Sequence, residues 1–113
     1  MNEWEKGQAG YLYDANNDEK IVKAREECAD LCFDFNNCRP SDVKQQEKIL
    51  HKIIGSISGS LVVTAPFYCD YGTNISIGDN FYSNHNLVIL DGAKVTFGDN
   101  VFIAPNCVFS TAG

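Results

Sequence analysis

Hydrophobic residues in the second half of the chain recur every six positions. One column falls at Val63, Cys69, Ile75, Phe81, Leu87, Val95, Val101 and Cys107. A second column, two residues further on, holds Ala65, Tyr71, Ile77, Ser83, Ile89, Phe97, Ile103 and Phe109. The residue before the first column is Asn at positions 74, 80, 86, 100 and 106. A six-residue period with paired inward positions and a turn residue predicts a mainly β fold, the parallel β-helix of hexapeptide repeats.

The spacing has a direct physical reason. Side chains at i and i+2 of a strand point the same way, so each pair lines one side of a core. The three residues between pairs must turn the chain, and Asn and Gly tolerate the left-handed φ values of such corners. Stacked coils then place Ile75 under Val95, Phe81 under Val101 and Leu87 under Cys107. Ordinary hairpins are the alternative, but they do not require five Asn in one phase.

One interruption of the repeat marks a candidate binding loop. Leu87 and Val95 are eight residues apart instead of six, so two extra residues enter the corner from Leu90 to Lys94. Insertions in a solenoid are expected as loops at corners, where binding residues commonly lie. Asp91 in this corner is a candidate ligand, although a loop Asp is more often a turn former.

The first half of the chain has helical periodicity. Its apolar residues predict a helix from Asp18 to Asn36, with Asn17 or Asp18 as N-cap: Ile21, Ala24, Cys28, Leu31 and Phe35. A second helix is expected from Ser41 as N-cap to Gly55, burying Val43, Ile49, Leu50, Ile53 and Ile54. We therefore expect a small α-helical domain over residues 1–57 and the β-helix over 58–113.

Charge and composition exclude several classes of function. The net charge of −6 argues against nucleic acid and against an anionic membrane surface. Eight of the nine Lys and Arg residues precede Leu61, and only Lys94 follows it. The sequence shows no signal peptide and no apolar run that could span a bilayer, so a cytoplasmic location is expected.

The five cysteines form no CxxC pair. Cys69 and Cys107 occupy apolar columns, and Cys28 and Cys32 face one side of the predicted helix. Cys38 with His51 is a poor set of further metal ligands. Reduced structural thiols are therefore favoured over a disulfide, and no metal is expected.

Several motifs resemble one family. Pro66 to Gly72, Asn74 to Gly78 and Ile103 to Asn106 resemble the hexapeptide-repeat sugar O-acetyltransferases, which include the maltose, galactoside and nodulation acetyltransferases. Tyr11 to Asp14 and the helical pair resemble the N-terminal domain of maltose acetyltransferase. The resemblance implies a left-handed β-helix, a homotrimer with sites between subunits, and acetyl transfer from acetyl-CoA to a sugar hydroxyl by a general-base histidine.

The resemblance also implies a set of acceptor residues. Asp14 matches a carboxylate near the sugar, Tyr82 and Asn84 match an acceptor-site Tyr and Asn, and Asp91 matches the acidic residue of the inserted corner. Asp70 stands where some members have Ser. Carboxylates accept hydrogen bonds from sugar hydroxyls, whereas Asn84 as a simple corner residue stays open.

The sequence departs from the family at its end. The general-base His of the family follows a stretch like Ser110 to Gly113, so here it would follow Gly113. His85 is interpreted as a corner residue, and Lys94 is the only cation in the coil for CoA phosphates. The 113-residue chain is therefore expected to be inactive on its own. The alternatives are a short non-catalytic subunit and a structural β-solenoid without ligand.

Overall fold

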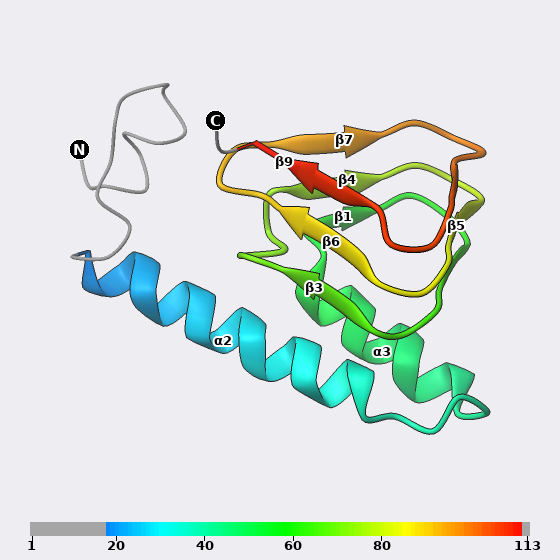
Figure 1. Cartoon of the computed structure of the whole chain (residues 1–113), viewed down its shortest axis with the longest axis horizontal. Coiled ribbons are helices and arrows are strands. Elements are labelled where there is room, and N and C mark those ends of the chain that lie inside the picture. The colour runs from blue at the N-terminus through cyan, green and yellow to red at the C-terminus, as the bar shows by residue number, and fades with distance from the viewer. Residues whose placement is uncertain (1–17, 112–113) are drawn as a thin grey trace.

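The fold consists of two helices followed by nine short strands (Figure 1), in a computed structural model that describes residues 18–111. The helices are α2 (Glu19–Asn36) and α3 (Val43–Ile53). The strands are β1 (Ser56–Ile57), β2 (Leu61–Val63), β3 (Phe67–Cys69), β4 (Ile75–Ile77), β5 (Phe81–Ser83), β6 (Leu87–Leu90), β7 (Val95–Phe97), β8 (Phe102–Ile103) and β9 (Val108–Ser110). They form three parallel sheets, ordered β1-β4-β7, β2-β5-β8 and β3-β6-β9. Each coil gives one strand to each sheet, which confirms the predicted parallel β-helix after a helical part.

The stacking of the coils follows the predicted register. Ile75 pairs with Val95. Tyr82 pairs with Phe102 and Val88 with Val108. The residues just before them, Phe81 and Leu87, are therefore in register with Val101 and Cys107, as predicted. Inward side chains fill the narrow interior, and the following are at most 2 % exposed: Ile75, Ile77, Phe81, Leu87 and Ile89.

The predicted phase is wrong in the first coil. Val63 pairs with Ser83 and Cys69 with Ile89, so both belong to the second column. Leu61 and Phe67 fill the first column in their place. Side chains two residues apart point the same way, so the sequence pattern cannot distinguish these two phases. In this phase Phe67 and Ile75 are eight residues apart, as Leu87 and Val95 are. The repeat is therefore interrupted at two corners, one after β3 and one after β6, and these two corners stack.

Asparagine forms the regular corners. Positive φ angles occur at Asn80, Asn86, Asn100 and Asn106, as the sequence predicts. The side chain of Asn80 donates to Asn100, and that of Asn86 to Asn106, both over 2.9 Å. In the longer corner before β4, Gly72 has the positive φ instead, at 76°.

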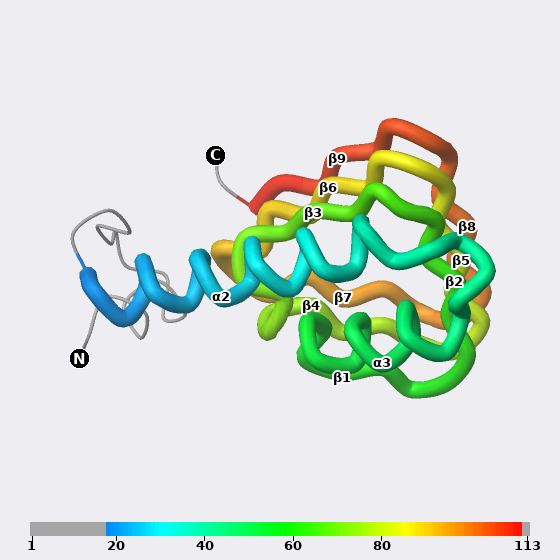
Figure 2. Tube along the Cα trace, turned by 90° about the horizontal axis from the view of Figure 1, so that it is seen from below, coloured from blue at the N-terminus to red at the C-terminus, as the bar shows by residue number. Residues whose placement is uncertain are grey.

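The two helices cover the N-terminal end of the coil (Figure 2), next to the first strands β1, β2 and β3. Phe35 of α2 is fully buried, and its ring packs edge-on against Phe67 with centroids 6.3 Å apart. Residues of both helices and of the coil belong to one hydrophobic core. The helical part therefore caps the solenoid by sharing its interior. Strand β1 begins at Ser56, two residues before the expected boundary.

The helix ends refine the sequence predictions. Asp18 caps α2 by accepting the N–H groups of Lys20 and Ile21. Asp42, and not Ser41, caps α3. Val43 was expected to be buried, but it is 54 % exposed because it faces a cavity of about 330 Å³ between α3 and β2 instead of the core. Neither described helix is long and apolar enough to cross a membrane.

Candidate functional site

The corner after β6 is organised by the carboxylate of Asp91. Its Oδ1 accepts the N–H groups of Asp70 at 3.1 Å and Tyr71 at 2.9 Å, and its Oδ2 accepts that of Asn74 at 3.2 Å. The side chain of Asn74 donates to the Asp91 carbonyl at 2.8 Å. Asp91 thus ties the two long corners together. Asp91 is fully buried, so the expectation that the extra residues of this corner form an open loop is wrong for Asp91.

The electrostatics of this corner follow from burial. Burial raises the pKa of Asp91, while the N–H groups of Tyr71 and Asn74 act in the opposite direction. Burial also raises the pKa of Asp70, and the positive charge of Arg25 on α2 partly offsets it. Asp70 is only partly buried, so it is the carboxyl group of this corner that solvent or a ligand can reach. Sequence analysis missed Arg25 because helical spacing does not reveal a partner on another element.

Tyr82 lies in the middle of β5, and Asn84 lies at the corner that follows this strand. The Tyr82 ring points outward, is 37 % exposed, and lies tilted against Phe102 with centroids 6.4 Å apart. The side-chain oxygen of Asn84 accepts the N–H of His85 at 2.7 Å. The side-chain NH2 group of Asn84 is the donor that could bind the oxygen of a hydroxyl. The Nδ1 of His85 is hydrogen-bonded to the Ala65 carbonyl.

The two corners lie at opposite ends of one strand. Strand β6 separates Asn84 from Asp91 (Figure 1). Strand β6, from Leu87 to Leu90, alone spans about 10 Å, so the two corners lie at least that far apart. Within one chain, Asp70 is therefore close to Asp91, and Tyr82 is close to Asn84. The two pairs are not close to each other. Asp14, the fifth predicted residue, lies outside the described residues.

The three-sided coil with asparagine corners defines a hexapeptide-repeat protein, and comparisons with known proteins agree. The maltose acetyltransferase hexapeptide capping motif matches residues 6–59. A putative acetyltransferase of Saccharomyces cerevisiae is 52 % identical over 92 % of this chain and 53 % of its own length. The galactoside O-acetyltransferase of Escherichia coli is 43 % identical over 74 % of this chain and 41 % of its own length.

Solved structures show the same relationship. A maltose O-acetyltransferase from Clostridium difficile superposes with a TM-score of 0.96 at 42 % identity, over 100 % of this chain and 60 % of that protein. A galactoside acetyltransferase in complex with coenzyme A gives a TM-score of 0.93 at 38 % identity, over 100 % of this chain and 56 % of that protein. The chain is thus a homologue of the hexapeptide-repeat sugar O-acetyltransferases. It spans about half the length of these relatives.

Proposed function

We propose that this chain carries the acceptor side of an O-acetyltransferase that moves an acetyl group from acetyl-CoA to a sugar hydroxyl. The similarity to a maltose O-acetyltransferase over the whole chain carries the proposal. Tyr82, Asn84 and Asp70 are proposed to contact the sugar. Asp91 supports Asp70 from behind, because its buried carboxylate holds the backbone of Asp70 and Tyr71. Asp14 remains a predicted sugar contact, and a cytoplasmic location remains a prediction.

The proposed reaction is a direct acyl transfer. A base removes the sugar hydroxyl proton, the oxygen attacks the thioester carbonyl, and CoA leaves as its thiol. A positioned base contributes roughly 10²–10⁴-fold to such a step. The resemblance places the base after Gly113, and not at His51, which lies on α3, or at His85, which follows Asn84 at its corner. We therefore expect the base outside residues 18–111.

We further propose a homotrimer whose acceptor sites lie between subunits. The outer face of the β2-β5-β8 sheet carries an exposed apolar ladder, defined as Val62, Tyr82 and Phe102, which are 55 %, 37 % and 69 % exposed. The outer face of the β1-β4-β7 sheet is polar, with Ser56, Ser76 and Thr96 in register. Exposed apolar patches commonly mark association surfaces. We propose that in this cyclic assembly the Asn84 corner of one subunit faces the Asp70 corner of the next.

A fusion protein tests the proposed activity. This chain is joined to the part of the E. coli galactoside O-acetyltransferase that lies beyond its matched region. CoA release and acetylated sugar are measured with galactosides and maltose as acceptors. We expect transfer by the fusion and none above background by the 113-residue chain alone. In the fusion, Asn84→Ala and Asp70→Ala are each expected to lower kcat/KM by about 10-fold or more, the loss of one or two hydrogen bonds to the acceptor.

A matched control is Asn100→Ala, since Asn100 is a corner residue on another side of the coil. It should keep transfer within about 3-fold, provided that the fusion remains folded by circular dichroism. A folded fusion without any transfer would reject the proposal and favour a non-catalytic subunit. Transfer by the 113-residue chain alone would show that the base lies within it.

A further inference from the structure

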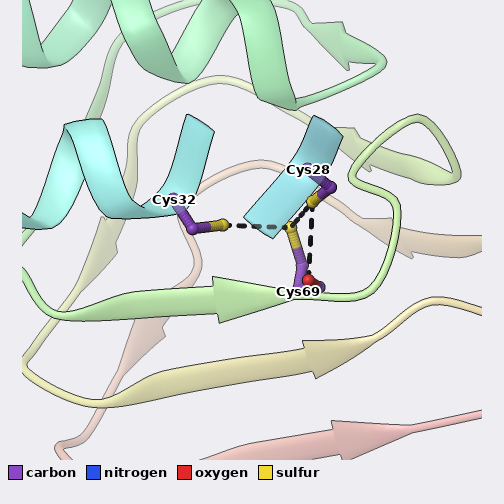
Figure 3. Close-up of side chains that lie close together, drawn as sticks. All are labelled: Cys28, Cys32 and Cys69. Carbon is purple, nitrogen blue, oxygen red and sulfur yellow. Dashed lines mark hydrogen bonds between the residues drawn. The ribbon is translucent and has the colours of Figure 1, made fainter. Parts of the chain in front are cut away.

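Two cysteines of α2 meet a third from the coil, Cys69, which is distant in sequence (Figure 3). Cys28 and Cys32 lie one helical turn apart on the face of α2 that covers the coil, and Cys69 ends β3. The Sγ atoms of Cys28 and Cys69 are 3.4 Å apart, and those of Cys32 and Cys69 are 4.0 Å apart. All three sulfur atoms lie within 4.8 Å of one another. The acetyl-transfer proposal makes no use of this thiol cluster.

The triangle of sulfur atoms has the dimensions of a metal site. The Sγ atoms of Cys28 and Cys32 are at most 4.8 Å apart. At that limit, the point equidistant from the three sulfurs lies about 2.4 Å from each. If the Cys28 and Cys32 sulfurs are about 4 Å apart, the distance from this point to each sulfur becomes about 2.2 Å. Zinc–thiolate bonds are about 2.3 Å long. The donors therefore need little movement to bind one ion at the centre.

We propose that Cys28, Cys32 and Cys69 form a three-thiolate site for a soft metal ion of the Cu⁺ or Zn²⁺ class. Thiolates select such ions over hard cations. On binding, each remaining S–H bond breaks, its proton goes to solvent and a metal–sulfur bond forms, so no oxidant or reductant is needed. Three coplanar sulfur donors satisfy Cu⁺, whereas Zn²⁺ takes a water as fourth ligand.

Access from solvent supports the site. Cys28 and Cys32 are 3 % and 2 % exposed, but Cys32 and Cys69 line an open cavity of about 320 Å³ between α2 and β3. An ion and a water molecule can enter there.

The bound ion would join the helical part to the coil. Cys28 and Cys32 belong to the cap, and Cys69 belongs to the first coil, 41 and 37 residues further along the chain. Metal–sulfur bonds to residues on both sides of this contact would hold α2 on the end of the solenoid. Metal binding should therefore raise the thermal stability of the folded chain.

The test titrates the reduced, metal-free 113-residue chain with Zn²⁺ and, under anaerobic conditions, with Cu⁺. Native mass spectrometry, competition with a chromophoric chelator and thermal unfolding are the readouts. We expect one ion per chain, a higher Tm, and slower alkylation of three of the five thiols than in the metal-free chain, where burial alone already slows it. Cys32→Ser should weaken binding by about 100-fold or more, beyond the 10–100-fold typical of losing an outer-shell partner.

Cys38→Ser and Cys107→Ser are the matched controls, because both thiols lie outside the cluster. They should bind the ion as the unmodified chain does. If Cys32→Ser does not fold, the gain in thiol protection on adding the ion to the metal-free unmodified chain decides, and no gain would overturn the proposal. Binding that is equal in Cys32→Ser, the absence of 1:1 binding for both ions, or a disulfide that forms in their presence would each overturn the proposal.

Discussion

Replacing Phe81 with alanine is expected to lower the free energy of unfolding by about 3–5 kcal/mol, the usual cost of deleting a buried aromatic ring. Phe81 is 2 % exposed, and its ring packs against that of Phe97 with centroids 5.4 Å apart. The interior of the coil is narrow and is fixed by hydrogen bonds between stacked strands, so it cannot collapse around the cavity. Urea unfolding followed by circular dichroism measures the change.

Phe33→Ala is the matched control for this measurement. Phe33 is also a phenylalanine, but it is 67 % exposed on α2. Its removal should change the unfolding free energy by no more than about 0.5 kcal/mol. A loss below about 1 kcal/mol for Phe81→Ala would mean that the coil interior is not packed as described.

Asp91→Ala is expected to be the second large destabilisation, roughly 3 kcal/mol or more, because it leaves the buried N–H groups of Asp70, Tyr71 and Asn74 without their acceptor. Asp91→Asn should cost less, about 1–3 kcal/mol. The amide oxygen can still accept from Asp70 and Tyr71, but the amide nitrogen would face the Asn74 N–H. An exposed, turn-forming Asp would tolerate Asn with little loss of stability, so the expected loss follows from the burial of Asp91.

Asp99→Ala is the control for Asp91, since Asp99 accepts the N–H of Asp79 at 2.7 Å but is exposed. It should cost about 1 kcal/mol or less. Equal losses at Asp91 and Asp99 would contradict the structural role of the buried carboxylate.

The pH dependence of the Asp91 contribution has a definite sign. Burial raises the pKa of Asp91, so between its unfolded and folded pKa values the folded state binds more protons. Stability from this group is therefore fully present at low pH and falls as pH rises from about 4 through the raised pKa. The difference in unfolding free energy between the unmodified chain and Asp91→Asn should narrow over that range.

The sequence predicted the solenoid because its period is a local property. Ile75, Phe81 and Leu87 fall in their predicted places, and Asn80 and Asn86 turn their corners as expected. The phase of Val63 and Cys69 was wrong because a shift of two residues keeps the same side chains inward. The second interruption, before Ile75, was hidden for the same reason.

The candidate site was less predictable because it depends on contacts between coils. Asp91 was found, but its inward orientation depends on Asp70, Tyr71 and Asn74 of the coil below. The meeting of Cys69 with two helical cysteines required the docking of α2 on β3. Neither contact leaves a periodic signal in the sequence.

Mixing of subunits tests the central claim, an acceptor site of a sugar O-acetyltransferase that is shared between two copies of this chain. Fusions with Asn84→Ala and with Asp70→Ala are unfolded together, refolded as a 1:1 mixture and assayed for acetyl transfer. If Asn84 of one subunit and Asp70 of the next serve one site, random mixed trimers have about one quarter of their sites intact. We predict recovery of about one quarter of the unmodified activity. Activity that stays at the mean of the two separate variants would contradict the shared site.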